Sequence, residues 1–266
     1  MKTCIIGKNL NIESETPIYK YLSMESFLYF LLHKEIMFSK LSSWPDAFEG
    51  ARFEFFKQIE NEDEYSNKTK DHFFGSSWTL QTENSCCYCD SDEHETAEKE
   101  LREVGSASMW EVYCRNGGAR IKTTIGKVET ILKQKANNYD CHKGEVHYEP
   151  SDYWNRTLTT SNLISKLFIK RVSFRHESEY RFILVANKNT ETNQIFFDVA
   201  SLYDFVDEFL ISPAISNNVW ISKMLYHYAI SESKSKDSVG TNYKNGKNYC
   251  KISQLYEKNI SEEIRF

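Results

Sequence analysis

The first fifty residues carry apolar positions that predict a strand, a helix and a second strand. The apolar and aromatic run 18–22 predicts the first strand, and Ser23 after it is a suitable helix N-cap. Residues 36–39 predict the second strand. Between the two strands, apolar side chains recur at helical spacing, at Phe27, Leu28, Leu31 and Leu32.

The rest of the chain continues as an irregular alternation of strands and helices. Apolar runs predict strands at 73–80, 119–124, 144–148, 205–212 and 250–255. Helical spacing predicts helices at 51–71, 126–136, 163–168 and 219–230, and one more that ends at 109–113. The polar segments 83–98 and 231–248 are expected to be loops. We therefore predict the α+β class, with a lead-in (residues 1–16) and a single domain (residues 17–266) whose central, mostly antiparallel β-sheet is flanked by helices.

The segment 174–185 carries the most informative polar pattern. Glu177, Glu179 and Arg181 occupy alternate positions and run into an apolar strand, so they are expected to line one strand face. Two neighbouring carboxylates are costly unless a cation or a ligand offsets them. One interpretation is a solvated edge strand with a diagonal ion pair between glutamate and arginine. The other is a site in which one carboxylate holds a ribose hydroxyl or acts as a base, while Arg181 binds a phosphate or orients a carboxylate.

Two further strands carry candidate binding residues. Tyr19 and Tyr21 share one face of the first predicted strand, with Lys20 on the other. They are either core aromatics beside a solvated lysine or a ligand-facing strand on which a ring stacks. In the strand at 73–80, the hydroxyls of Ser77 and Thr79 are either tolerated in an edge strand or bind ribose and orient a catalytic carboxylate.

Composition and charge narrow the class of protein without naming a function. Of 266 residues, 40% are hydrophobic and 27% charged, which is ordinary for a soluble globular protein. A formal net charge of −5 gives no general reason to expect a nucleic-acid partner. The N-terminal apolar run is too short for a signal peptide, and no window approaches the length that spans a bilayer. We therefore expect a cytoplasmic protein without a membrane partner.

The seven cysteines are odd in number and unevenly spaced, so we expect reduced thiols. Cys86, Cys87 and Cys89 lie near His94, but they lack the spacing of a CxxC pair and have no second ligand pair. We predict no metal site, although whether this cysteine cluster binds a metal stays open.

Several of these pieces occur together and in order in a known family. The chain resembles the bacterial proteins grouped as domain of unknown function 2971 over roughly residues 18–255. The matching residues are Tyr19-Lys20-Tyr21, Met37-Phe38-Ser39, Asp46-Ala47-Phe48-Glu49, Ser77-Trp78-Thr79, Met109-Trp110 with Tyr113, Gly118-Ala119-Arg120-Ile121, Val146-His147-Tyr148, Lys166 or Lys170, Glu177-x-Glu179-Tyr180-Arg181 and Leu210-Ile211-Ser212-Pro213. The resemblance adds Trp110, Tyr113 and Arg120 to the candidate substrate-binding residues.

The order of these pieces is also similar to that of ADP-ribosyltransferases of the arginine–serine–glutamate kind. This likeness implies NAD as substrate, with Glu179 bound to the ribose, Glu177 activating the acceptor, and Ser77 or Thr79 in support. Breaking the glycosidic bond of NAD builds positive charge on the ribose, which a carboxylate stabilises while an aromatic ring stacks on nicotinamide. The first-strand arginine or histidine of the transferases has no clear equivalent here, since Lys20 is a poor substitute.

Three functions follow as hypotheses. The first is an NAD-using ADP-ribosyltransferase or NAD glycohydrolase, a toxin-like or antiviral (phage-defence) effector with a macromolecular target or a partner defence protein. The second is a non-catalytic module that binds a nucleotide or a protein, with Arg181, Arg120 and Lys20 as phosphate ligands. The third is a metal-dependent nuclease whose oxygen ligands are Asp46, Glu49, Glu177 and Glu179.

Overall fold

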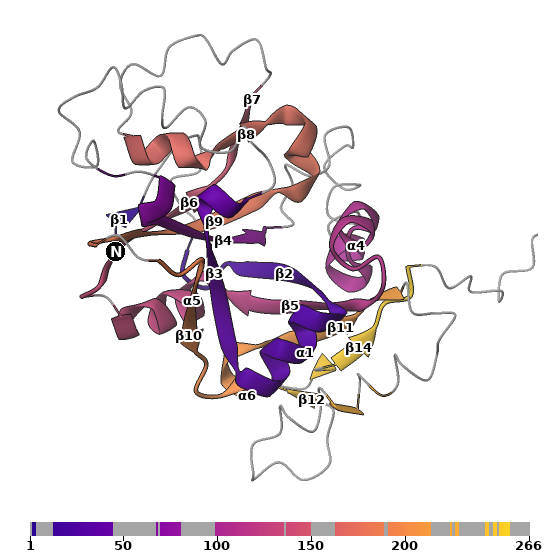
Figure 1. Ribbon diagram of the computed structural model, residues 1–266. Helices are drawn as coiled ribbons and strands as arrows, with labels where there is room; N and C mark the ends of the chain where they lie inside the picture. The colour runs from indigo at the N-terminus through magenta and orange to yellow at the C-terminus, as the bar shows by residue number, and fades with distance from the viewer. Residues whose placement is uncertain are drawn as a thin grey trace, which may run out of the picture. The chain divides into compact units, whose positions relative to one another are not determined.

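The computed structural model describes residues 2–3, 13–44, 68, 70–80, 99–135, 137–149, 163–188, 191–213, 224, 227–228, 243–244, 247–248 and 250–255. This part of the chain combines helices with a large mixed sheet that is mostly antiparallel, so the predicted α+β class is confirmed (Figure 1). The chain divides into two compact units. Unit 1 comprises Met1–Lys20, His33–Cys87 and Thr123–Ala200, and unit 2 comprises Tyr21–Leu32, Tyr88–Lys122 and Ser201–Phe266. The boundary between residues 16 and 17 stays a prediction.

The strands are β1 (Lys2–Thr3), β2 (Pro17–Ser23), β3 (Glu35–Lys40), β4 (Phe73–Thr79), β5 (Gly118–Thr124), β6 (Tyr139–Glu145), β7 (His147–Glu149), β8 (Ile169–Arg171), β9 (Glu179–Ala186), β10 (Gln194–Asp198), β11 (Glu208–Ile211), β12 (Tyr243–Lys244), β13 (Lys247–Asn248) and β14 (Cys250–Ile252). The α-helices are α1 (Met24–His33), α4 (Ala107–Tyr113), α5 (Ile125–Leu132) and α6 (Leu202–Phe205). Short 3-10 helices are η1 (Leu41–Ser43), η2 (Lys70–His72), η4 (Lys133–Lys135), η6 (Leu163–Phe168) and η7 (Val172–Glu177).

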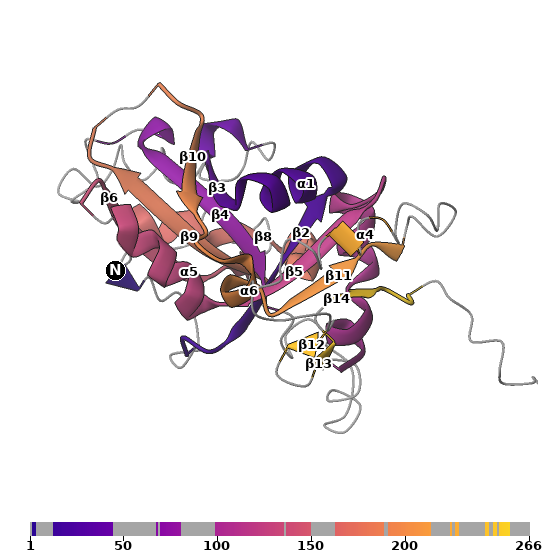
Figure 2. The ribbon, with the colours of Figure 1, turned by 90° about the horizontal axis from the view of Figure 1, so that it is seen from below.

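In unit 1 the strand β9 lies in the middle of the sheet. The strands follow the order β1, β6, β9, β4, β2, and β3 pairs with both β4 and β10 (Figures 1 and 2). Every residue of β9 is buried, which agrees with its nearly continuous apolar run. Its antiparallel neighbours cover its whole length, with Gly75 opposite Ile183 in β4 and Cys141 opposite Leu184 in β6. The centre of this sheet therefore carries the strand that was predicted to hold the candidate carboxylates.

The helix α5 of unit 1 follows strand β5 without a loop. The hydroxyl of Thr124 caps it by accepting from the backbone N–H of Lys127. Its buried side chains recur at helical spacing, at Ile125, Val128, Ile131 and Leu132. An ion pair between Lys143 of β6 and Glu129 joins this helix to the sheet.

Unit 2 is built on β5, β11 and β14, with β11 antiparallel to β5 and parallel to β14. Helix α1 begins after Ser23, whose hydroxyl accepts from the backbone N–H of Ser26 as predicted. The ring of Phe27 on this helix contacts Phe209 of β11, with centroids 5.8 Å apart. The first position of β5 requires glycine, because Gly118 has a φ of +143° and an added Cβ would lie 2.0 Å from the carbonyl oxygen of Leu22.

Several predicted elements differ in detail. The strand expected at 144–148 is two strands, β6 and β7, interrupted at Val146, and the helix expected at 163–168 is the 3-10 helix η6. Strands β12 and β13 form a small hairpin inside the segment 231–248 that was expected to be a loop. Most of the predicted helices 51–71 and 219–230, and the whole of 83–98, lie outside the described residues. Within the described part of the chain, no helix combines the length and apolar character that a bilayer crossing requires.

Candidate functional site

The strand that carries the predicted carboxylates begins later than expected. Glu177 ends η7, and Ser178 has a φ of 42°, in the left-handed region. The expectation that Glu177, Glu179 and Arg181 line one strand face is therefore wrong for Glu177, because Ser178 breaks the alternation before β9 starts. The edge-strand alternative is also wrong, since β9 is buried between β6 and β4.

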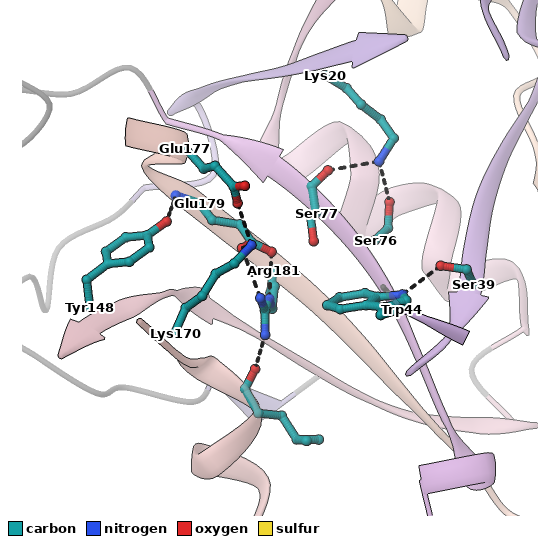
Figure 3. A network of polar contacts seen from close by, with 11 residues as sticks. Lys20, Ser39, Trp44, Ser76, Ser77, Tyr148, Lys170, Glu177, Glu179 and Arg181 are labelled. Atoms are coloured by element: carbon teal, nitrogen blue, oxygen red, sulfur yellow. Dashed lines mark hydrogen bonds and ion pairs between the residues drawn. The ribbon is translucent and has the colours of Figure 1, made fainter. Parts of the chain in front are cut away.

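The two carboxylates and the arginine nevertheless meet in a buried network that Lys170 of β8 completes (Figure 3). The ammonium of Lys170 donates to Glu177 at 2.5 Å and lies 3.5 Å from Glu179. Arg181 donates through Nε and Nη2 to the two carboxylate oxygens of Glu179, at 2.6 and 2.9 Å. All four residues are buried. Two cations thus balance two carboxylates, which is the condition for burying like charges side by side.

The network fixes the charge of Glu179. Burial opposes ionisation of this carboxyl group, but the charge and hydrogen bonds of Arg181, with Lys170 and Ser77, outweigh burial and lower the pKa of Glu179 to about 2. The hydroxyl of Tyr148 accepts a hydrogen bond from the backbone N–H of Glu179 at 2.8 Å. Burial, reinforced by the charge of Glu179, raises the pKa of Tyr148, so this phenol stays protonated. Glu179 is therefore ionised at neutral pH and does not act as a proton donor there.

Arg181 is fully engaged by its own chain. Besides its two bonds to Glu179, its Nη1 donates to the backbone carbonyl of Leu167 at 2.5 Å. The guanidinium carbon lies 4.8 Å from the centroid of the Trp44 ring, and Trp44 in turn donates to the hydroxyl of Ser39 at 2.8 Å. Arg181 is only 1% exposed, so it serves as the counter-charge of Glu179 and is not presented to a phosphate from solvent.

The register of three strands brings Tyr19, Thr79 and Glu179 into one row. Thr79 of β4 lies opposite Tyr19 of β2 on one side and opposite Glu179 of β9 on the other. Directly opposed residues of antiparallel strands point to the same face. Ser77 lies opposite Arg181 and shares this face. Five of the seven predicted residues on these strands therefore lie on one side of the sheet, namely Tyr19, Ser77, Thr79, Glu179 and Arg181.

Lys20 of β2 lies on the other face of the sheet. Its neighbour Tyr19 shares the face of Thr79, so the side chain of Lys20 leaves the strand on the opposite face. Its Nζ donates to the hydroxyl of Ser76 at 3.2 Å and to the backbone carbonyl of Ser77 at 2.8 Å. The same Nζ lies 5.2 Å from the centroid of the Trp78 ring. Lys20 is thus neither the solvated lysine nor a member of the Tyr19–Thr79–Glu179 row.

The remaining predicted residues, Tyr21, Trp110, Tyr113 and Arg120, belong to unit 2. The rings of Tyr21 and Trp110 meet edge to face with centroids 4.8 Å apart, and both are buried. Arg120 is fully buried and donates to the backbone carbonyls at 101 and 102 and to Glu208. Tyr113, at 41% exposure, is the only one of the four that solvent reaches substantially.

Three members of the network were missing from the predicted site. Lys170 supplies the bridging cation, Tyr148 binds the backbone of Glu179, and Trp44 covers Arg181 (Figure 3). Lys170 and Tyr148 both lie within the pieces that carry the family resemblance, and that position was the available signal. Trp44 had no such signal, because its indole reaches Arg181 only through the folding of the η1 segment.

Metal ligation finds no support in the described part of the chain. Within these residues, no group of three or more histidine, cysteine, aspartate or glutamate side chains is placed to hold a metal ion. The proposed oxygen ligands Asp46 and Glu49 lie outside the described residues. The same is true of the cysteine cluster, Cys86, Cys87 and Cys89.

Comparison of the chain with family models, with curated proteins and with solved structures found no match. The resemblance to the domain of unknown function 2971 therefore stays a prediction from the quoted residues.

Proposed function

We propose that the chain is an NAD-using ADP-ribosyltransferase or NAD glycohydrolase whose site is built on β2, β4 and β9. The observation that carries the proposal is the row Tyr19–Thr79–Glu179, which sets an aromatic ring, a hydroxyl and a carboxylate on three adjacent strands. This is the combination that stacking on nicotinamide, binding a ribose hydroxyl and stabilising positive charge on the ribose would use.

The charges of the network define the role of each carboxylate in this proposal. Glu179 remains ionised at neutral pH, so it acts by its charge and by accepting hydrogen bonds from the ribose. Glu177 activates the acceptor. Lys170 already binds both carboxylates, so the substrate takes the place of its ammonium at Glu179. The positive charge of the nicotinamide ribose would then replace the charge of the displaced Lys170 ammonium beside Glu179.

The proposal is tested by incubating the purified chain with NAD, alone and with cell lysate. Chromatography measures nicotinamide release, and labelled NAD measures transfer of ADP-ribose to protein. We expect Glu179→Gln to abolish both, and Glu177→Gln to abolish transfer while nicotinamide release persists. Glu111→Gln is a matched control, because Glu111 forms an exposed ion pair with Arg115. Thermal melting of each variant separates loss of chemistry from loss of folding.

Two results would count against an NAD enzyme. One is the absence of both products with the folded wild-type chain. The other is activity that survives Glu179→Gln, which would remove the residue on which the proposed chemistry rests.

A second candidate is a non-catalytic nucleotide- or protein-binding module. It is favoured because the members of the network already bind one another. Glu179 and Arg181 bind each other and other groups of their own chain, as structural ion pairs do. An increase in melting temperature on addition of NAD, without any nicotinamide release, would support this candidate over the enzyme.

A further inference from the structure

The hydroxyl of Tyr148 takes the place of a backbone acceptor at the start of β9. Strand β6 pairs with β9 as far as Glu145, which lies opposite Tyr180. In an antiparallel sheet, the two residues of a hydrogen-bonded pair exchange both of their backbone bonds. Val146 and Glu179 form the first of these bonds, since the N–H of Val146 donates to the carbonyl of Glu179 at 2.8 Å. The second differs, because the N–H of Glu179 donates to the phenolic oxygen of Tyr148, also at 2.8 Å.

The phenol reaches this position because the chain leaves β6 at Val146. Residues 147–149 form β7, which belongs with β8 to a separate two-stranded sheet. In this parallel pair Tyr148 lies directly opposite Lys170, so the two side chains leave the pair on the same face. Tyr148 binds the backbone N–H of Glu179, and Lys170 lies 3.5 Å from its carboxylate (Figure 3). The β7–β8 pair therefore contacts both the backbone and the side chain of Glu179.

The first residues of β9 need such contacts to hold their conformation. Ser178 has a φ of 42°, in the left-handed region that is costly for a residue with a Cβ. Its N–H donates to the carbonyl of Arg175 at 3.1 Å, and its carbonyl accepts from the N–H of Leu80 at 2.8 Å. With the two bonds of Glu179, four hydrogen bonds fix this turn into the strand. Of these four, only the bond to Tyr148 uses a side chain, so a substitution can remove it without altering any backbone group.

We propose that Tyr148 is a positioning residue for Glu179, because its hydroxyl fixes the peptide group from which the catalytic carboxylate projects. This inference rests on the proposed function, in which Glu179 stabilises positive charge on the ribose. A carboxylate does so best when its orientation is fixed before the charge develops. In that proposal the substrate displaces Lys170, so the carboxylate loses one of its contacts when NAD binds. The bond from the backbone of Glu179 to Tyr148 remains.

Tyr148 acts in this role as a hydrogen-bond acceptor and exchanges no proton. Burial, reinforced by the charge of Glu179, raises the pKa of Tyr148, so the phenol stays protonated at least up to its ordinary value of 10. A neutral phenol can accept the N–H of Glu179 through its oxygen. Tyr148→Phe therefore removes one acceptor and leaves the charge of the site unchanged.

Amide hydrogen exchange tests the backbone part of this inference without any substrate. NMR spectroscopy of the isotopically labelled full chain measures the exchange rate of each amide in β9. We expect Tyr148→Phe to speed exchange at Glu179 about fivefold or more, because this amide loses the hydrogen bond that protects it. Ile183 and Val185, which lie farther along the pairing with β6, are expected to keep their wild-type rates. An unchanged rate at Glu179 overturns the inference.

Steady-state kinetics with NAD test the catalytic part. We expect Tyr148→Phe to lower kcat for nicotinamide release about tenfold and to change KM less than about twofold, because stabilisation of the developing charge depends on the fixed orientation. The pH profile of kcat should keep its shape, since the phenol exchanges no proton. Tyr29→Phe is the matched control, because Tyr29 is 39% exposed on helix α1. Thermal melting establishes that both variants are folded at the assay temperature.

The outcomes distinguish this inference from the proposed function. Faster exchange at Glu179 with an unchanged kcat would make Tyr148 a purely structural residue and overturn the inference. An equal loss of kcat in Tyr29→Phe would do the same. Absence of nicotinamide release by the folded wild-type chain would overturn the proposed function and, with it, the role of Tyr148 in catalysis. The exchange rate at Glu179 would then still decide whether Tyr148 fixes this part of the backbone.

Discussion

Replacing Glu179 by glutamine tests the electrostatic account of the buried network directly. The change keeps the size of the side chain but removes its charge. Of the two carboxylates that balance Arg181 and Lys170 in the network, only Glu177 then remains. Removing one partner of a buried ion pair typically costs about 3–5 kcal/mol. We therefore expect Glu179→Gln to lower the free energy of unfolding at pH 7 by about that amount.

The pH dependence of stability gives a second, independent value for the contribution of Glu179 to the free energy of unfolding. The pKa of Glu179 falls from an ordinary value of 4.5 to about 2, which corresponds to about 3 kcal/mol of stability at neutral pH. Because the folded pKa is the lower one, this stability is present above pH 4.5 and is lost as pH falls toward 2. Between pH 6 and pH 3, the wild-type chain should lose about 2 kcal/mol from this group alone. Glu179→Gln should lack that part of the loss.

Urea unfolding at pH 6 and pH 3, followed by circular dichroism, measures both quantities. Glu111→Gln is the matched control, because it removes a glutamate from an exposed ion pair whose two side chains are 64% and 78% solvent-accessible. Such a pair contributes only about 0.2–1 kcal/mol. Equal losses of stability between pH 6 and pH 3 in Glu179→Gln and in wild type would refute the assignment of this pH dependence to Glu179.

Three further predictions concern other parts of the chain. Arg181→Lys keeps the charge but loses the two-point contact with Glu179, and urea unfolding should show a loss of about 2 kcal/mol; an unchanged midpoint would contradict the role of the guanidinium. Gly118→Ala places a Cβ against the carbonyl of Leu22, and should lower the melting temperature by several degrees, which an unchanged thermal melt would disprove. Burial raises the pKa of Cys114 to about 12, so iodoacetamide at pH 8 should label this thiol only after unfolding; rapid labelling of the native chain, detected by mass spectrometry, would count against the burial.

The sequence predicted most of the sheet because strand signals depend on local side chains. Strands β2, β4 and β9 and the cap at Ser23 follow from apolar runs and from one hydroxyl before a helical repeat. The break at Ser178 could not be predicted, since serine has no special preference for positive φ and the alternation of charges continues through it. Local patterns therefore gave the elements of the sheet but misplaced the start of one strand.

The contacts of the site depend on distant parts of the chain. Lys170 lies on a strand of only three residues, and its partners are set by the way β8 and η7 fold back toward β9. The opposition of Tyr19 to Thr79 depends on the register of two strands that are separated by a large part of the chain. Periodicity identifies faces within a strand, but it does not specify which residue of a distant strand lies opposite.

The central position of β9 has a consequence for the order in which the chain folds during synthesis. Strands β4 and β6 are both made before β9, yet they do not pair with each other in the sheet. Until residue 186 has left the ribosome, each of them presents an unpaired backbone edge, the kind of surface that promotes association between chains. The arrival of one eight-residue strand closes both edges at once and completes the charge network in the same step. A nascent chain that stops short of β9 is therefore the form of this protein most exposed to aggregation.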